Sequence, residues 1–178
     1  MGSLDDDSTY AGGNATDHVE VNEAAVEEAA TWPATGAPLF FEGTSQLYAP
    51  VSVEPGAHVQ FEDGGGLAVK SDGGALIADA GGGEPITFEG ATASPGHRKM
   101  PEFESDEADN LLDNVTVAHA GHDGWPGVLV RSGARAVVRN STIRNSASWG
   151  VVIEDGATLD GSNNTFENNA DGDIDERS

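Results

Sequence analysis

The sequence predicts an all-β solenoid, a parallel β-helix with about three short strands in each coil. Three observations support this prediction: a sequence repeat, an alternation of apolar residues within each copy, and a composition rich in turn residues, with 24 glycines and 8 prolines. The clearest copies are residues 127–149 and 150–172, which align without a gap and share eight identical positions. Repeats of this length indicate stacked structural units.

Alternation of apolar residues identifies the strands within one copy. In "GVLVR", Val128 and Val130 are expected to point inward, and Leu129 and Arg131 outward. This period of two is typical of β-strands. One copy therefore holds three strands, "GVLVR", "ARAVV" and "STIRN". Stacking the copies places three pairs of apolar residues in contact: Val128 on Val151, Val130 on Ile153, and Ile143 on Phe166.

Four asparagines recur at the corners between strands, where "NSTIRNS" is followed one copy later by "NNTFENN". Asparagine tolerates the left-handed backbone conformation that a tight corner needs, and its amide can bond to an asparagine stacked on it. We expect two such ladders, Asn140 with Asn163 and Asn145 with Asn168.

An earlier copy, "LDNVTVAHAGHDGWPG", matches when Thr116 is aligned with Thr142, and its connection is slightly expanded. Residues 51–90 indicate shorter opening coils, with Gly56-Ala57 and Gly74-Ala75 in similar contexts one short coil apart.

The expected domain organisation has three parts. Residues 1–30 form an acidic lead, in which "NEAAVEEAA" (22–30) predicts a short N-terminal capping helix; alternatively, the flanking "VEV" and "ATW" are strands. Residues 31–172 form the β-helix, with an irregular insertion at 91–110. Residues 173–178 are an acidic tail.

The net charge of −23 makes nucleic acid and anionic membrane surfaces poor partners, because both would be repelled. Acidic, lysine-poor chains are typical of salt-loving microbes, and a halophilic archaeon is the expected source. No apolar run approaches the length of a membrane span, so we expect no membrane insertion. The N-terminus has no signal-peptide pattern, and we interpret the chain as a trimmed or partial form of an exported or surface protein.

The region from Thr31-Trp32 to Asn169 resembles the right-handed parallel β-helix proteins of bacteria and archaea, the pectate-lyase-like superfamily. The features that carry the resemblance are Thr31-Trp32, "VEPGAHVQFED", "GGALIADAGGGEPITFEG" and the "NxTxxxN" corners. The resemblance implies a right-handed coil. It implies no single activity, because this superfamily includes lyases, hydrolases, epimerases and modules without known activity.

The expanded connection "AHAGHDGWPG" is the strongest candidate for a binding site. Its residues His119, His122, Asp123 and Trp125 would lie on a loop at the edge of the stack, where binding residues are often found. Trp125 and Trp149 could stack against a sugar ring, and a His-Asp pair could transfer protons. The alternative is an ordinary solvated loop.

The clustered arginines have a structural explanation. The alignment of the copies places Arg131 opposite Glu154, Arg144 opposite Glu167, and Arg139 opposite Asp113. Cross-strand ion pairs are therefore expected. Arg135 faces Thr158 and lacks an acidic partner, which makes it a further candidate ligand-binding residue.

No catalytic residue is assigned from the resemblance. Of the polygalacturonase-type motifs, Gly121-His122-Asp123 matches only the first two residues of one, and no stacked aspartates resemble the calcium site of pectate lyases. "DGDIDE" (171–176) resembles the start of a calcium-binding loop, but the later glutamate is missing. We therefore expect no cofactor and no metal, with calcium as the weaker alternative.

Three hypotheses about function remain. The first is a non-catalytic exported or surface module that acts as a rigid scaffold or binds a polysaccharide or cell-surface glycan. The second is a carbohydrate-active enzyme, a polysaccharide lyase or glycoside hydrolase. The third is a fragment of a longer β-helix, whose exposed strand edges would associate end to end.

Overall fold

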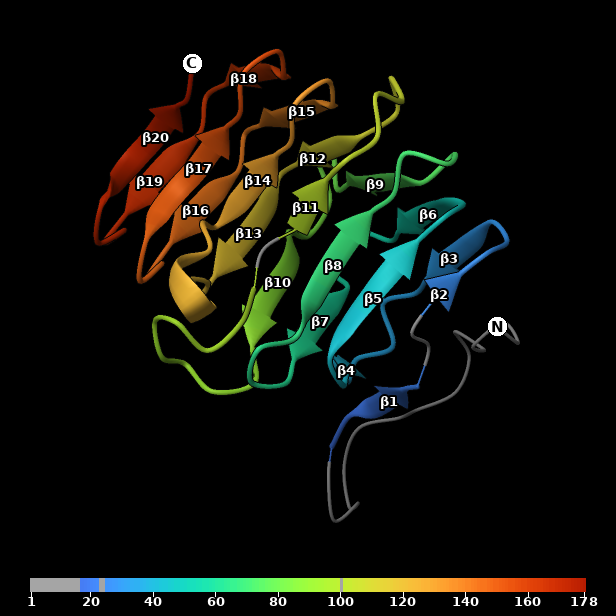
Figure 1. Cartoon of the computed structure of the whole chain (residues 1–178). Coiled ribbons are helices and arrows are strands. Elements are labelled where there is room, and N and C mark those ends of the chain that lie inside the picture. The colour runs from blue at the N-terminus through green and yellow to red at the C-terminus, as the bar shows by residue number, and fades with distance from the viewer. Residues whose placement is uncertain (1–16, 23–24, 100) are drawn as a thin grey trace.

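The computed structural model describes residues 17–22, 25–99 and 101–178, and in this part of the chain it is a solenoid of three parallel sheets (Figure 1). Sheet A contains β1 (Val19–Val21), β4 (Leu39–Phe41), β7 (His58–Phe61), β10 (Ile86–Gly90), β13 (Val115–Ala118), β16 (Thr142–Arg144) and β19 (Thr165–Glu167). Sheet B contains β2 (Ala25–Val26), β5 (Thr44–Leu47), β8 (Gly66–Val69), β11 (Pro101–Phe103), β14 (Val128–Val130), β17 (Trp149–Ile153) and β20 (Gly172–Glu176). Sheet C contains β3 (Ala30–Trp32), β6 (Pro50–Val53), β9 (Ala75–Asp79), β12 (Leu111–Asp113), β15 (Arg135–Arg139) and β18 (Thr158–Ser162).

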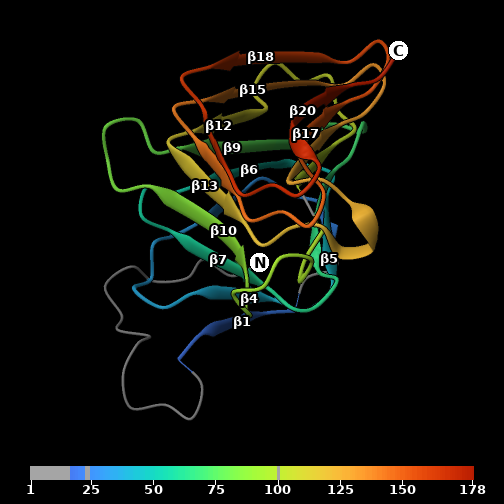
Figure 2. The ribbon, with the colours of Figure 1, turned by 90° about the vertical axis from the view of Figure 1, so that its left-hand side faces the viewer.

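Each coil of the chain adds one strand to each sheet, and the sheets form the three sides of a cylinder (Figure 2). The inward residues of all three sheets make one apolar core, in which Trp32, Phe41, Phe61, Phe88 and Phe103 are fully buried. The predicted right-handed β-helix is therefore confirmed.

The strand register confirms the repeat. Val128 pairs with Val151 and Val130 with Ile153 between β14 and β17. Ile143 pairs with Phe166 between β16 and β19, at the same step along the chain. One coil earlier, Thr116 pairs with Thr142, as the alignment of the copies predicts.

The predicted N-terminal capping helix is wrong. Among the described residues of this segment, Ala25–Val26 and Ala30–Trp32 are strands that pair with β5 and β6. Val26 is 2% exposed and Trp32 is fully buried, so pairing and burial outweigh the helix propensity of the alanines and glutamates. The first coil thus begins at β1, inside the predicted acidic lead, whereas residues 1–16 and 23–24 lie outside the described part.

The expected spacing of the opening coils, from Gly56-Ala57 to Gly74-Ala75, is also wrong. Ala57 precedes β7 in sheet A, whereas Ala75 begins β9 in sheet C. The actual steps are longer and unequal. Leu39 pairs with Val59 and Val59 pairs with Phe88, so the second step is much longer than the first. The coils differ in length because the glycine-rich turns between their strands differ in length.

Two other boundaries change. The predicted insertion at 91–110 contains a regular strand, β11, that pairs with β8 and β14, and Arg98 before it forms a parallel bridge with Ala120, so the segment is not one continuous insertion. The predicted acidic tail begins inside β20, which pairs with β17. In both segments a short stretch, "PEF" in β11 and "GDIDE" in β20, forms a paired strand although acidic residues surround it.

Candidate functional site

The loop between β13 and β14 projects at the corner between sheets A and B (Figures 1 and 2). It contains a short 3₁₀ turn, His122–Gly124, in which Asp123 has a positive φ of 53°. A Cβ atom on Gly121 would lie 2.5 Å from the backbone nitrogen of Ala147, so the loop packs directly on the next coil. Backbone conformations of this kind often occur at functional sites.

His119, the residue before this loop, occupies an asparagine position of the corner ladder. Ala118 pairs with Arg144 and Arg144 with Glu167, so the residues that follow them, His119, Asn145 and Asn168, are stacked. Their φ angles are 63°, 55° and 54°, all left-handed. A histidine therefore replaces the ladder asparagine where the expanded loop begins.

The imidazole of His119 is buried beside a carboxylate. The residue is 6% exposed, and its Nδ1 has no hydrogen-bond partner within the described residues. The nearest carboxylate oxygen, Oε2 of Glu89, is 3.9 Å from Nδ1, beyond hydrogen-bond distance. Burial lowers the pKa of His119, although the negative charge of Glu89 opposes this effect. His119 is thus a neutral imidazole with an unused nitrogen at pH 7.

Glu89 lies between His119 and a second histidine, His58. Its Oε1 lies 2.8 Å from Nε2 of His58 and accepts a hydrogen bond of 3.3 Å from Nε2 of Gln60. The hydrogen bond with His58 is the largest cause of a lowered pKa for Glu89, which is therefore ionised at neutral pH. These residues come from β7, β10 and the end of β13, three consecutive strands of sheet A.

A fully buried arginine lies behind this group. Arg98 donates hydrogen bonds to three carbonyl oxygens: from Nε to Ala118 at 2.8 Å, from Nη2 to Phe88 at 3.3 Å, and from Nη1 to Lys99. Burial lowers the pKa of Arg98 to about 9, with Glu89 as the carboxylate that opposes the shift. Arg98 thus anchors the segment before β11 to the ends of β10 and β13.

The predicted His-Asp pair is present on the loop itself. Nε2 of His122 is 3.4 Å from Oδ2 of Asp123, and its Nδ1 is 3.3 Å from Oδ1 of Asp63. His97 reaches the same oxygen of Asp63 at 4.0 Å. We call the group of His58, His97, His119, His122, Glu89, Asp63 and Arg98 the histidine corner. It brings together four of the five histidines of the chain.

The two candidate tryptophans lie together on the outer face of sheet B. Trp125 and Trp149 are partly exposed and pack on Leu129 and Val152, which are 2% and 1% exposed. Leu129 points outward, as predicted, but it is buried because the tryptophans cover it. The guanidinium carbon of Arg131 lies 5.1 Å from the ring centre of Trp125.

Arg135 does not join the other candidate residues. It is exposed on β15 in sheet C, and its register partner is Thr158, as expected. His119, His122, Asp123, Trp125 and Trp149 belong to the A–B corner and the adjoining face of sheet B. The sequence candidates thus divide between two faces of the cylinder.

Comparison with known protein families agrees with this architecture. A family model described as "Right handed beta helix region" matches residues 86–176, slightly more than half of the chain. The chain belongs to the right-handed β-helix family. No curated protein and no solved structure matched it.

In this right-handed β-helix, sequence reasoning missed most of the histidine corner. Asp63, Glu89 and Arg98 come from coils whose steps are irregular, so no repeat offset connects them with His119. One signal was available: four histidines in a chain of 178 residues fall between positions 58 and 122. Their separation along the sequence gave no reason to place them together.

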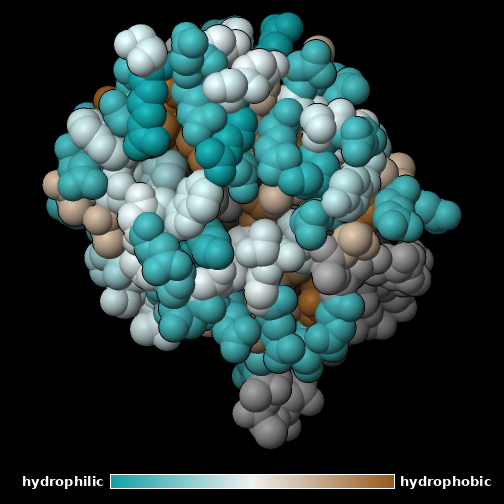
Figure 3. Space-filling view, in the orientation of Figure 1, coloured by the Kyte–Doolittle hydropathy of each residue, from teal (hydrophilic) through white to brown (hydrophobic). Residues whose placement is uncertain are grey.

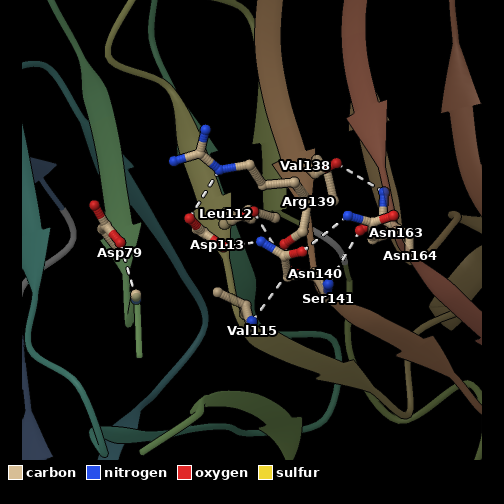
Figure 4. A network of polar contacts seen from close by, with 11 residues as sticks. Asp79, Leu112, Asp113, Val115, Val138, Arg139, Asn140, Ser141, Asn163 and Asn164 are labelled. Carbon is tan, nitrogen blue, oxygen red and sulfur yellow. Dashed lines mark hydrogen bonds and ion pairs between the residues drawn. The ribbon is translucent and has the colours of Figure 1, made fainter. Parts of the chain in front are cut away.

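The predicted asparagine ladders are confirmed. Nδ2 of Asn163 donates to Oδ1 of Asn140, and Nδ2 of Asn168 donates to Oδ1 of Asn145, both at 3.3 Å. Figure 4 shows the first ladder continuing to Asp113, whose Oδ1 accepts from Asn140 at 2.7 Å. The neighbouring residue, Ser141, accepts from the backbone nitrogen of Val115 through its hydroxyl. These contacts form a structural network along the cylinder corner.

Two of the three predicted arginine pairs are ion pairs. Arg131 contacts Glu154 at 2.8 Å, and Arg139 contacts Asp113 at 2.8 Å. Arg144 is the register partner of Glu167, as expected, but within the described residues it forms no ion pair. Arg131 also contacts Glu102 at 2.5 Å, so these arginines stabilise neighbouring coils.

The acidic tail residues have protein partners. Oδ2 of Asp175 accepts from Nε of Arg177 at 2.8 Å, and Oδ2 of Asp171 accepts from the hydroxyl of Ser148 at 3.1 Å. Among the described residues, no three histidine, aspartate or glutamate side chains are grouped to hold a metal ion. The described part also has no helix with the length and apolarity needed to cross a bilayer.

Proposed function

We propose that this right-handed β-helix is a non-catalytic module, exported or displayed at a cell surface, that acts as a rigid scaffold and binds a glycan. The observation that supports the proposal is the pair of partly exposed tryptophans, Trp125 and Trp149, on the outer face of sheet B. Aromatic faces stack on the apolar C–H faces of sugar rings. Trp149 belongs to strand β17, and Trp125 follows the 3₁₀ turn of the loop and packs on the same two aliphatic residues, Leu129 and Val152.

The surroundings of the tryptophans suit a polyhydroxylated ligand. Figure 3 shows the face of sheet B covered mainly by hydrophilic and intermediate residues, with hydrophobic colour only in small areas between them. His122 and Asp123 border Trp125 on the loop, and Arg131 lies beside its ring. Such groups can exchange hydrogen bonds with hydroxyls, while an extended apolar partner would find little matching surface.

The charge of the protein narrows the class of glycan. A net charge of −23 repels polyanions at low salt, so neutral polysaccharides are the first class of glycan to test under those conditions. The same charge and the presence of only two lysines support a working environment of concentrated salt, where self-repulsion is screened. Unfolding temperatures measured at low and at near-saturating salt test this part of the proposal, with higher stability expected in concentrated salt.

Affinity electrophoresis through gels that contain neutral polysaccharides, with tryptophan fluorescence titration, tests glycan binding. We expect Trp125→Ala and Trp149→Ala each to abolish retardation by the polysaccharide that binds the unaltered protein. Phe40→Ala is a matched control, because Phe40 is a partly buried aromatic residue on sheet A, stacked on His18 at 4.6 Å. Retardation that survives both tryptophan substitutions would rule out this face.

A second candidate function is a carbohydrate-active enzyme, because His122 lies within 3.4 Å of carboxylates on both sides, Asp63 and Asp123. A histidine so placed could act as a general acid or base. Incubation with polysaccharides, with and without calcium, should then release reducing ends or unsaturated products. His122→Ala would abolish that release. Product release that persists in this variant would exclude His122 as the catalytic group.

A further inference from the structure

A groove on the outer face of sheet C, remote from the tryptophans, has a composition that differs from the rest of that face. It encloses about 250 Å³ and is lined by Ile77, Ala108, Asp109, Leu111, Val137 and Arg139. Its volume suits a small organic molecule rather than a polymer.

The floor of the groove is a column of three aliphatic side chains from consecutive coils. Ile77 pairs with Leu111, and Leu111 pairs with Val137, in the registers of β9, β12 and β15. All three point outward, yet they are partly buried and not fully exposed. The same column holds polar residues at both ends, Ser52 before Ile77 and Asp160 after Val137. The aliphatic residues are thus confined to the coils where the segment 104–110 leaves the cylinder and forms a wall.

Arg139 supplies a positive charge at the rim. Its Nε donates to Oδ2 of Asp113 at 2.8 Å, and the carboxyl group of Asp113 is 8% exposed. Asn140 holds the other oxygen of this carboxylate at 2.7 Å. The guanidinium is therefore fixed through one nitrogen. Figure 4 shows its two terminal nitrogens directed away from Asp113, and neither has a hydrogen-bond partner in the described part of the chain.

We propose that this groove binds a small organic monocarboxylate with an apolar body. The terminal nitrogens of Arg139 match the two oxygens of a carboxylate in a bidentate contact. The aliphatic floor would take the hydrocarbon part, which loses contact with water on binding. Arg139 favours an anion, and the exposed Asp109 on the wall is the opposing charge. A neutral apolar molecule would leave the two terminal nitrogens of Arg139 without a partner.

The proposal is tested with hexanoate as the probe, at a salt concentration that screens the net charge. Two-dimensional NMR of methyl-labelled protein would follow Ile77, Leu111 and Val137 as the probe is added. Hexanol and hexylammonium, which have the same number of carbon atoms but no carboxylate, are the comparison ligands. We expect hexanoate to shift these methyl signals saturably, and the comparison ligands to shift them at least ten-fold less.

Three variants make the test specific. Arg139→Gln should weaken hexanoate binding at least ten-fold, whereas Arg135→Gln, on the same face of the same strand but outside the groove, should leave it unchanged. Val137→Thr preserves the shape of the floor but adds a hydroxyl, and it should weaken hexanoate without altering the circular dichroism spectrum. Equal shifts with hexanol, or full affinity in Arg139→Gln or Val137→Thr, would overturn the proposal.

Discussion

His119 occupies the corner position that Asn145 fills one coil later, and both residues have left-handed backbone angles, with φ of 63° and 55°. The substitution of histidine for asparagine interrupts a hydrogen-bonded ladder. In its place the corner gains a buried imidazole beside Glu89, together with the loop that carries Trp125. The candidate site therefore begins at His119, the corner position where the asparagine ladder ends.

Replacing His119 by asparagine should extend the ladder and reduce the sensitivity of the protein to acid. Because burial lowers the pKa of His119 in the folded state, the unfolded chain binds this proton more tightly. The free energy of unfolding should therefore fall as the pH drops below about 6.5, the ordinary histidine value. In His119→Asn, unfolding by guanidinium between pH 7.5 and 5.5 should show a smaller loss.

Glu89 and Asp113 have lowered pKa values, so their protonation reduces the stability of the protein only at lower pH. His119→Asn should therefore still unfold in stronger acid. The stabilising effect of the two carboxylates is present above the ordinary carboxyl values and is lost as the pH falls through the lowered ones. An identical loss between pH 7.5 and 5.5 in both proteins would contradict the role given to His119.

Arg98→Met should destabilise the fold and release the segment 91–99. Three carbonyl oxygens would lose the Arg98 donor, and the contacts of two of them, Ala118 and Phe88, are buried, at a cost of about 1–3 kcal/mol for each buried group left unpaired. Hydrogen exchange should accelerate in residues 91–99 before it does elsewhere. Lys99→Met, at the adjacent and less buried position, is the control and should change neither quantity appreciably.

Asn145→Ala should cost more stability than Asn145→Gly. Both substitutions remove the amide that accepts from Asn168. Only alanine adds the penalty of a Cβ atom in the left-handed region, about 1–2 kcal/mol. Denaturation midpoints of the two variants, compared with the unaltered protein, give the difference directly. Equal midpoints would show that the corner is not left-handed.

Glu176→Val should promote end-to-end association. Glu176 is the register partner of Ile153, and it shares the inward side of β20 with Ile174, which is 44% exposed. An inward-pointing charge at a sheet edge discourages the addition of another strand. Sedimentation at high salt should detect larger species in this variant. Asp173→Val removes an equal charge from the opposite side of β20 and should remain unassociated.

The C-terminal half of the cylinder could be predicted from the sequence because its coils keep a nearly constant length. Val128 over Val151 and Asn140 over Asn163 follow from one offset. The N-terminal half could not, since the step from Leu39 to Val59 is much shorter than the step from Val59 to Phe88. Glu89 and Arg98 were missed for this reason. Alternation correctly placed Leu129 on the outer face, but it did not reveal that a tryptophan from a loop covers it.

The site depends most on the proximity of Glu89 and His119, which coils of unequal length bring together. An NMR titration of the His119 imidazole tests it most directly, in the unaltered protein and in Glu89→Gln. The structure predicts a His119 pKa below the ordinary histidine value, and a further decrease in Glu89→Gln because Glu89 raises it. A His119 pKa at the ordinary value, or one that does not respond to Glu89→Gln, would contradict the account.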